Sequence, residues 1–220
     1  AILNPKINSE LRIYMFALLH ELFEMGHFGV VLEEKAGDIV QGILLPNLSW
    51  RVGRVASSIR KIALKCCESL IRDSRVCRGI MMNNCAEPLV VTFLTCLEDD
   101  ENIIRSTCCN ILRFVFTINS VLLTEDNTRK VALALAKRLD DSNNKIRISA
   151  CMALSGLVQV YTNYKDSISV KYIVENLLIH LDDQSTDVRN AVFSCLCAIQ
   201  DVSPAIVKPL VIKKVEQCRN

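Results

Sequence analysis

A repeated frame is clearest in the segment Leu181-Asp182-Asp183-Gln184-Ser185-Thr186-Asp187-Val188-Arg189-Asn190-Ala191. In it, a leucine and two acids are followed by five residues and then by an arginine. The same frame runs from Leu139 to Arg147 and, with glutamate as the first acid, from Leu97 to Arg105. The arginines at 105, 147 and 189 are therefore evenly spaced, since 189 − 147 and 147 − 105 are both 42. A fixed period of this length indicates a repeat protein.

A looser fourth copy precedes these three. Arg60 lies 45 residues before Arg105, and Leu48 stands twelve residues before Arg60 instead of eight. Between Leu48 and Arg60, the segment Trp50-Arg51-Val52-Gly53-Arg54 replaces the acidic turn of the other copies with a basic one. It also contains the only tryptophan of the chain.

The composition favours an all-α protein. Half of the 220 residues are apolar, only 5% are aromatic, and glycine (7) and proline (5) are scarce, which favours aliphatic packing between helices over a turn-rich β fold. A chain of this length can bury a hydrophobic core without disulfide bonds. With 26 basic and 24 acidic residues the formal charge is +2, so no global field steers the chain to nucleic acid or to an anionic membrane.

The eleven cysteines predict neither disulfides nor a metal site. No CxxC pair occurs, and nearly all of the cysteines fall at apolar positions of expected helices. We interpret them as small buried residues of a protein in a reducing compartment, with no metal and no cofactor. The sequence has no signal peptide and no apolar run long enough to span a membrane, so we expect a cytoplasmic protein.

No motif predicts an enzyme. The histidines at 20, 27 and 180 have no nucleophile or acid at a motif spacing, and there is no phosphate-binding glycine loop, HExxH or GxSxG. We therefore expect no catalytic residues.

Hydrophobic periodicity predicts an α-solenoid of antiparallel helix pairs over the whole chain. We expect a helix from about Val30 to Leu45 that Pro46-Asn47-Leu48 ends, a next helix from Val55 to Ile71, and a short helix across Val76 to Met82. Leu11-Arg12 resembles the start of a second helix whose first helix is missing, so we expect the chain to be the C-terminal part of a longer solenoid. The expected units are residues 1–29, 30–73, 74–120, 121–163 and 164–201, with a terminal helix at 202–220.

The acids and arginines of the frame are predicted to be structural. The leucine closes the first helix, the acids lie in the turn, and the arginine lies at the start of the second helix. When units stack, acids and arginines form parallel rows, so that each arginine can pair with the aspartate of its own or the next unit. The residues of this ladder are Asp99, Arg105, Asp141, Arg147, Asp183 and Arg189.

The turn that breaks the frame is the candidate for partner binding. In one interpretation Trp50 packs between repeats and the arginines are solvated. In the other, an exposed tryptophan beside arginines is the composition of a protein-binding hot spot, made of Trp50, Arg51, Arg54 and Lys61. A continuous basic track is missing because residues 98–101 are acidic, which argues against nucleic acid.

This pattern resembles the HEAT repeat, in which two antiparallel helices carry an aspartate in the turn and a Val-Arg that opens the second helix. The resemblance implies a HEAT/armadillo-type superhelix and is strongest for residues 88–201; it departs at 46–60, where the turn aspartate is absent.

More specific strings are similar, in content and order, to the C-terminal HEAT repeats of the dynein axonemal assembly factors. They are Leu45-Pro46-Asn47-Leu48, Trp50-Arg51, Lys137-Arg138-Leu139-Asp140-Asp141 and His180-Leu181-Asp182-Asp183. That resemblance implies a cytoplasmic, non-enzymatic scaffold or co-chaperone adaptor for the preassembly of axonemal dynein arms in motile cilia. Its partners would be dynein chains, chaperones and co-chaperones, with no nucleic acid, membrane or small-molecule substrate. The alternative is a HEAT-type cytoskeletal (tubulin-binding) or transport (cargo) adaptor, and a HEAT-scaffold enzyme acting on nucleic acid is a weaker third.

Overall fold

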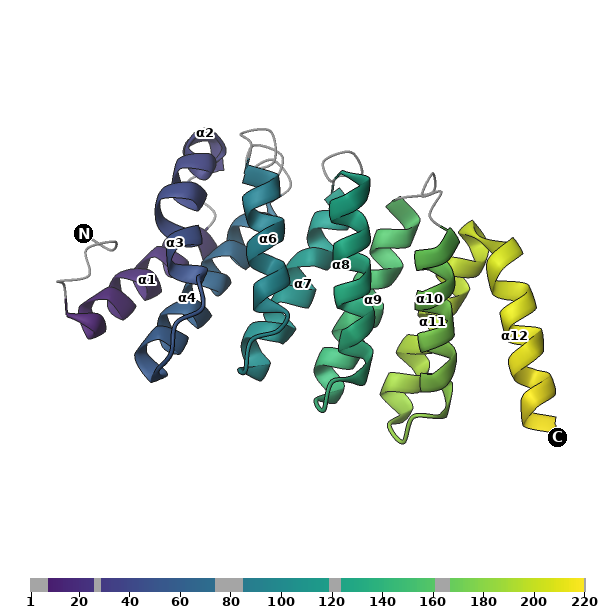
Figure 1. Ribbon diagram of the computed structural model, residues 1–220. Coiled ribbons are helices and arrows are strands. Elements are labelled where there is room, and N and C mark those ends of the chain that lie inside the picture. Colours follow the sequence, from purple (N-terminus) through teal and green to yellow (C-terminus); the bar gives the residue numbers. More distant parts are fainter. Residues whose placement is uncertain (1–7, 26–28, 74–84, 119–123, 161–166, 220) are drawn as a thin grey trace. The chain divides into compact units, whose positions relative to one another are not determined.

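The computed structural model describes residues 8–25, 29–73, 85–118, 124–160 and 167–219. Every regular element in these ranges is helical, which confirms the predicted all-α fold (Figure 1). The short helix expected at 76–82 lies outside the described residues. The chain divides into two compact units, Ala1–Leu123 and Thr124–Asn220.

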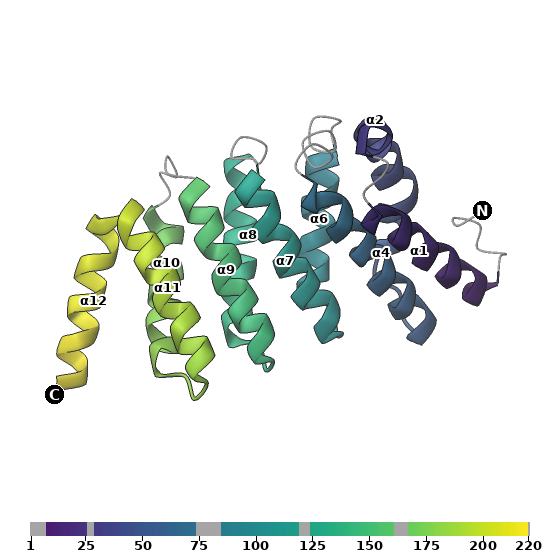
Figure 2. The ribbon, with the colours of Figure 1, turned by 180° about the vertical axis from the view of Figure 1, so that it is seen from behind.

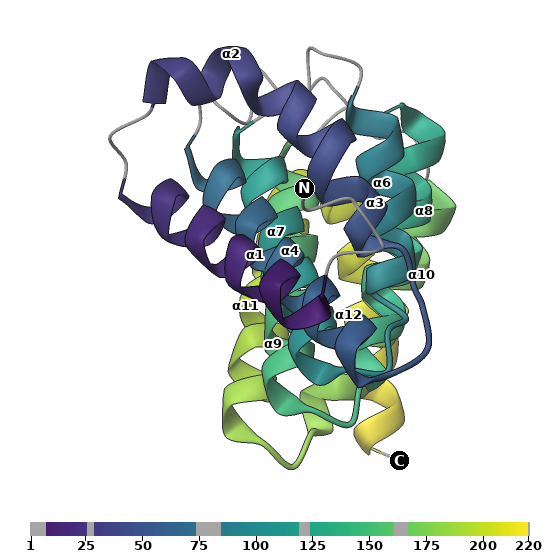
Figure 3. The same ribbon diagram turned by 90° about the vertical axis from the view of Figure 1, so that its left-hand side faces the viewer.

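Unit 1 is built from two layers of helices. Helix α1 packs on α4 and α4 packs on α7, which makes one layer, while α3 packs against α6 in the other. Figure 3 looks along this stack, with α1, α4 and α7 on one side and α3 and α6 on the other. The helices are α1 (Ser9–Glu24), α2 (Gly29–Ile39), α3 (Leu45–Leu48), α4 (Arg54–Arg72), α6 (Ala86–Cys96) and α7 (Asn102–Ile118).

The helix that precedes the tryptophan extends past Leu45, its predicted last residue, and ends at Leu48. A π-helical turn at Val40–Leu44 joins α2 to α3, and the helical path continues through Pro46 to Leu48. Leu45 donates its N–H to the carbonyl of Val40, five residues back. A proline lacks the donor for the usual bond to the carbonyl four residues earlier, and its ring clashes with that carbonyl in a regular helix. The wider π turn just before Pro46 relieves this conflict.

Unit 2 has the same two-layer plan. Helices α8, α10 and α12 pack in sequence in one layer, and α9 packs on α11 in the other; Figure 2 shows α9 and α11 from their own side. Short 3₁₀ turns at Arg138–Asp140 and His180–Asp182 end α8 and α10. The helices are α8 (Glu125–Lys137), α9 (Asn144–Val160), α10 (Ser167–Ile179), α11 (Thr186–Val202) and α12 (Pro204–Arg219).

Helix starts in both units use side-chain caps. The Asn8 side chain accepts a hydrogen bond from the N–H of Glu10 at the start of α1, and the Thr124 side chain accepts one from Asn127 at the start of α8. Glu125 and Asp126 in the first turn of α8 and Lys137 in its last turn complement the helix dipole. These local signals mark where α1 and α8 begin, whereas α4, α6 and α11 begin without a side-chain cap.

The cores are aliphatic and rich in cysteine. Eight of the nine cysteines that the structure describes as free thiols are buried, and Cys197 is exposed. Burial raises the pKa of the Cys66, Cys96 and Cys195 thiols to about 12. These thiols therefore stay protonated and act as small apolar side chains. In the described ranges, no three potential metal ligands come together, and no helix is both long and apolar enough to cross a membrane.

Candidate functional site

Each repeated turn is closed by its second acid. The carboxylate accepts a hydrogen bond from the backbone N–H two residues later, forming an Asx turn. The pairs are Asp99 Oδ1 with the N–H of Glu101 (3.0 Å), Asp141 Oδ1 with that of Asn143 (3.0 Å) and Asp183 Oδ1 with that of Ser185 (2.8 Å). The negative charge lies just before the N-terminus of the second helix, where the helix dipole stabilises it.

The arginine of each repeated frame lies on the second helix of its pair and holds the start of that helix and the turn before it. Two arginines donate through Nη1 to turn carbonyls: Arg105 to Asp99 O (2.7 Å) and Asp100 O (3.1 Å), and Arg189 to Asp183 O (2.6 Å) and Gln184 O (3.2 Å). All three arginines of the frame also donate through Nη2 to a side chain in the first turn of the same helix. These bonds run from Arg105 to Asn102 Oδ1 (2.6 Å), from Arg147 to Asn144 Oδ1 (2.7 Å) and from Arg189 to Thr186 Oγ1 (2.9 Å).

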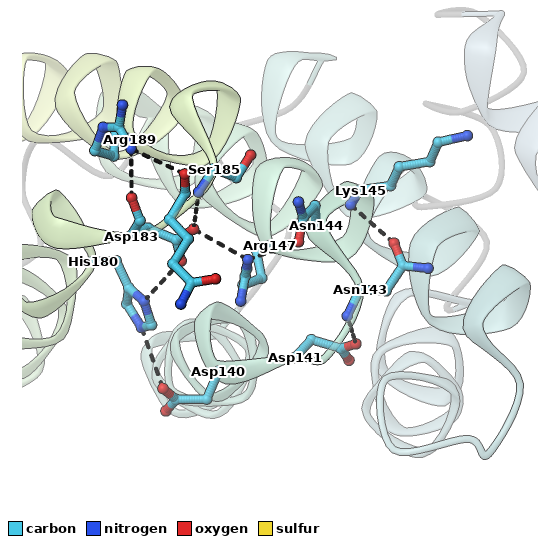
Figure 4. A network of polar contacts seen from close by, with 11 residues as sticks. Asp140, Asp141, Asn143, Asn144, Lys145, Arg147, His180, Asp183, Ser185 and Arg189 are labelled. Carbon is cyan, nitrogen blue, oxygen red and sulfur yellow. Dashed lines mark hydrogen bonds and ion pairs between the residues drawn. The ribbon is translucent and has the colours of Figure 1, made fainter.

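An arginine also reaches the aspartate of the following helix pair in each unit. In unit 1, Arg60 Nε lies 2.9 Å from Asp99 Oδ2, and the two side chains are 4% and 2% exposed. In unit 2, Arg147 Nη2 lies 3.2 Å from Asp183 Oδ1, and the side chains are 20% and 7% exposed (Figure 4). The aspartate therefore closes its own turn and receives a cation from the preceding pair.

A histidine adds a second polar contact between the successive pairs of unit 2. His180 Nε2 lies 3.3 Å from Asp140 Oδ1, across from the end of α10 to the end of α8 (Figure 4). The turns of the two pairs are thus joined by two separate side-chain contacts.

In unit 1, the buried pair of Arg60 and Asp99 also holds the turn that breaks the frame. We call residues 49–55, which connect α3 to α4 and include the first two residues of α4, the Trp50 turn. Arg60 Nη1 donates to the carbonyl of Arg51 (2.8 Å) while Nε binds Asp99. Gly53 adopts φ +108°, ψ 153°, a backbone conformation that residues other than glycine rarely adopt. A buried cation and a glycine together fix the shape of this turn.

The Trp50 turn presents apolar side chains and cations to solvent. Trp50 is 52% exposed and Val52 is 84% exposed. Arg51 and Arg54 are also exposed, and no carboxylate among the described residues forms an ion pair with either of them. An exposed tryptophan and nearby arginines are the residue types that dominate the energy of protein–protein contacts.

Two pockets lie on opposite sides of the turn. The larger, about 240 Å³, is bounded by Arg12 of α1, by the end of α3 and by the start of α4, and the apolar part of its lining is Pro46, Val52, Val55, Ala56 and Ile59. Arg12 Nη2 donates to Asn47 Oδ1 (2.7 Å) beside it. The smaller, about 160 Å³, lies between the turn and Asp100-Glu101. We call the larger one the α1–α4 pocket.

Lys61, the fourth residue of the predicted partner-binding set, is placed differently. Its Nζ lies 2.8 Å from Glu101 Oε2, and Ser57 Oγ donates to Glu101 Oε1 (3.0 Å). The hydrogen bond from Lys61, followed by that from Ser57, lowers the pKa of the Glu101 carboxyl. Lys61 therefore joins α4 to the start of α7, whereas Trp50, Arg51 and Arg54 face outward.

Sequence reasoning missed several residues of this region. Val52 and Val55 are exposed apolar residues of a basic turn, and the sequence beside Trp50 already shows these valines among arginines. Arg12 and Asn47, 35 residues apart, meet because α1 and α3 both pack on α4, which no local pattern shows.

The buried ionisable side chains among the described residues have structural partners or are neutral. The buried carboxylates are held by arginines or by turn N–H groups, and the buried thiols are protonated. A protonated thiol is a poor nucleophile, and a carboxylate held by an arginine is a poor general base. The Trp50 turn, by contrast, exposes apolar and cationic side chains to solvent.

Comparisons with known proteins agree with this architecture. A family model described as GCN1-like, C-terminal HEAT repeats matches residues 107–214. Among solved structures, a computationally designed armadillo repeat protein for modular peptide recognition superimposes with a TM-score of 0.63 at 14% identity, covering 98% of this chain and 88% of that one. At that identity the likeness shows the fold alone, and it confirms the predicted solenoid.

Curated relatives share the sequence as well. Dynein axonemal assembly factor 5 from Homo sapiens is 29% identical over 89% of this chain, and the one from Xenopus laevis is 24% identical over 99%. The alignments cover 24% and 26% of those proteins, so the chain spans about a quarter of their length. The chain is therefore an α-solenoid of the HEAT/armadillo type, and its sequence is similar to about a quarter of Dynein axonemal assembly factor 5.

Proposed function

We propose that this chain is part of a non-enzymatic scaffold that acts in the cytoplasm during the assembly of axonemal dynein arms. The observation that carries the proposal is the sequence similarity to Dynein axonemal assembly factor 5, which extends over 89% of the chain. The partners would be axonemal dynein chains together with the chaperones and co-chaperones that fold them.

The arrangement of the side chains supports a scaffold role. The acids and arginines of the repeated turns bind one another and the turn backbone, so they stabilise the stack and are not available for chemistry. The exposed tryptophan and arginines of the Trp50 turn supply a surface suited to protein contact. A stack of helix pairs presents such surfaces along an extended face, which is how solenoids bind their partners.

The test is affinity purification of the full-length tagged protein from cells that are building motile cilia. Dynein heavy and intermediate chains and chaperones should be enriched in the cytosolic fraction over a control purification with an unrelated HEAT-repeat protein. Purified full-length protein that sediments with microtubules, combined with no enrichment of dynein chains, would replace this proposal with the tubulin-binding alternative.

A further inference from the structure

We propose that the Trp50 turn binds an acidic segment of a partner protein, and that this segment inserts one apolar side chain into the α1–α4 pocket. The inference deepens the scaffold function and rests on it, because it names the chemistry of the partner at one site. Four features of unit 1 carry it: the size of the pocket, the charge around it, the exposure of Trp50 and the rigidity of the turn.

The pocket fits a side chain better than a metabolite. Its volume of about 240 Å³ is below the roughly 300–1,000 Å³ typical of small-molecule sites. Its apolar wall comes from the end of α3, the exposed valines and the first two turns of α4. One aliphatic or aromatic side chain buried there would also cover part of Val52 and Val55, which are exposed in the free protein.

The charge next to the pocket selects for acids. Arg51 lines both pockets, and the lining of the α1–α4 pocket contains Arg12 and Arg51 but no acidic residue. The smaller pocket is lined in addition by Asp100 and Glu101. The charge is therefore uniformly positive on the α1 side of the turn, whereas on the α7 side Arg51 and Arg54 lie beside two acids, of which Glu101 is paired with Lys61, so an acidic segment is attracted more strongly on the α1 side. This asymmetry fixes the side from which the segment approaches.

The exposed tryptophan supplies the second contact. Trp50 lies next to Arg51 in the chain and lines the smaller pocket with Arg54. A bound segment that crosses the turn from the α1–α4 pocket would cover the indole, and carboxylates on either side of the apolar anchor would face Arg51 and Arg54. Charge-assisted pairs between an arginine and a carboxylate are strong when water is excluded by a neighbouring apolar contact.

The turn is held in place before any partner binds. Arg60 binds the Arg51 carbonyl and the buried Asp99 at once, and Gly53 sets the chain direction into α4. A surface that is already ordered loses less conformational entropy on binding, so a short segment is enough.

The test measures binding of fluorescein-labelled heptapeptides to the 220-residue chain by fluorescence anisotropy. The probe has six glutamates around a central phenylalanine. Its matched controls have glycine in the centre, six glutamines in place of the glutamates, or six lysines. We expect the acidic phenylalanine peptide to bind at least about tenfold more tightly than each control, and its affinity to fall as salt is raised.

The variants locate the binding. Trp50→Ala and the double variant Arg51→Gln/Arg54→Gln should each weaken the probe at least about tenfold. Lys65→Gln, which removes an exposed cation elsewhere on α4, should leave binding within about twofold. Circular dichroism checks that each variant is folded.

Several results would overturn the inference: no detectable binding of the acidic phenylalanine peptide, equal binding by the turn variants, or tighter binding of the lysine peptide or of single-stranded RNA. The outcome is separable from that of the proposed function. If dynein chains co-purify with the full-length protein while the peptide fails to bind, the scaffold stands and its contact lies on another surface.

Discussion

Replacing Arg60 with alanine removes the cation of an enclosed ion pair. Arg60 Nε and Asp99 Oδ2 are 2.9 Å apart, and both side chains are almost inaccessible to water. Removing one partner of a buried pair costs about 3 to 5 kcal/mol, because the remaining charge stays buried without compensation. Asp99 keeps the N–H of Glu101 as a donor, while the Arg51 carbonyl loses its donor. We expect Arg60→Ala to lower the free energy of unfolding by about 3 to 5 kcal/mol.

The matched comparison is Arg147→Ala in unit 2. Its pair with Asp183 is longer, at 3.2 Å, and the arginine is 20% exposed. Water can therefore replace part of the lost interaction, and the expected loss is about 1 to 3 kcal/mol. Arg129→Ala, on an exposed side chain of α8 that pairs with Asp126 of the same helix, serves as the control and should change stability by about 0.5 kcal/mol or less.

The assay is urea unfolding followed by circular dichroism, with Asp99→Ala and the double variant completing a cycle with Arg60→Ala. A coupling energy of about 0.5 to 3 kcal/mol is expected, since the two residues are in direct contact. A loss below about 1 kcal/mol for Arg60→Ala, or a larger loss for Arg147→Ala than for Arg60→Ala, would show that burial does not set the strength of these pairs.

Three further outcomes are expected. Gly53→Ala should destabilise by about 1 to 3 kcal/mol in the same unfolding assay, and through backbone strain alone, because nothing lies within 4 Å of the added Cβ; an unchanged midpoint would refute the strain. Cys197 should react with iodoacetamide in the native protein at pH 8 while buried thiols such as Cys66 stay unmodified until urea is added, as peptide mass spectrometry will read out; early labelling of Cys66 would contradict its burial. Because the folded pKa of Glu101 is lowered, its pair with Lys61 stabilises the fold above the ordinary carboxyl pKa and is lost as pH falls through the lowered one; in Lys61→Ala the NMR titration midpoint of Glu101 should rise, and an unmoved midpoint would assign the shift to another group.

Local sequence patterns were sufficient for the helices and for the position of each turn. The apolar spacing predicted a helix from Val55 to Ile71, and α4 runs from Arg54 to Arg72. The exception at Pro46 arises because a π turn removes the clash that normally ends a helix at proline. A proline is compatible with either outcome, an end of the helix or a π turn before it, and the adjacent residues do not decide between the two.

The partners of the charged side chains depend on stacking. The sequence allowed an arginine to pair with the aspartate of its own helix pair or with that of the next helix pair. In the structure, Arg105 binds the carbonyl of its own Asp99, whereas the Asp99 carboxylate is bound by Arg60 of the preceding pair. Register between stacked helices decides this choice, and it follows from shape complementarity over many residues. Exposure of Trp50 is likewise a property of packing, so the sequence left two interpretations open.

Our main inference is that the Trp50 turn captures partners in dynein arm assembly. The direct measurement is quantitative mass spectrometry of dynein heavy and intermediate chains that co-purify with the full-length protein from ciliating cells. Wild type is compared with the triple variant Trp50→Ala/Arg51→Gln/Arg54→Gln and with the control Lys65→Gln, all at equal expression. We expect the triple variant to recover at least about tenfold less dynein and the control to match wild type. Equal recovery by the triple variant, with its helicity intact, would contradict the claim.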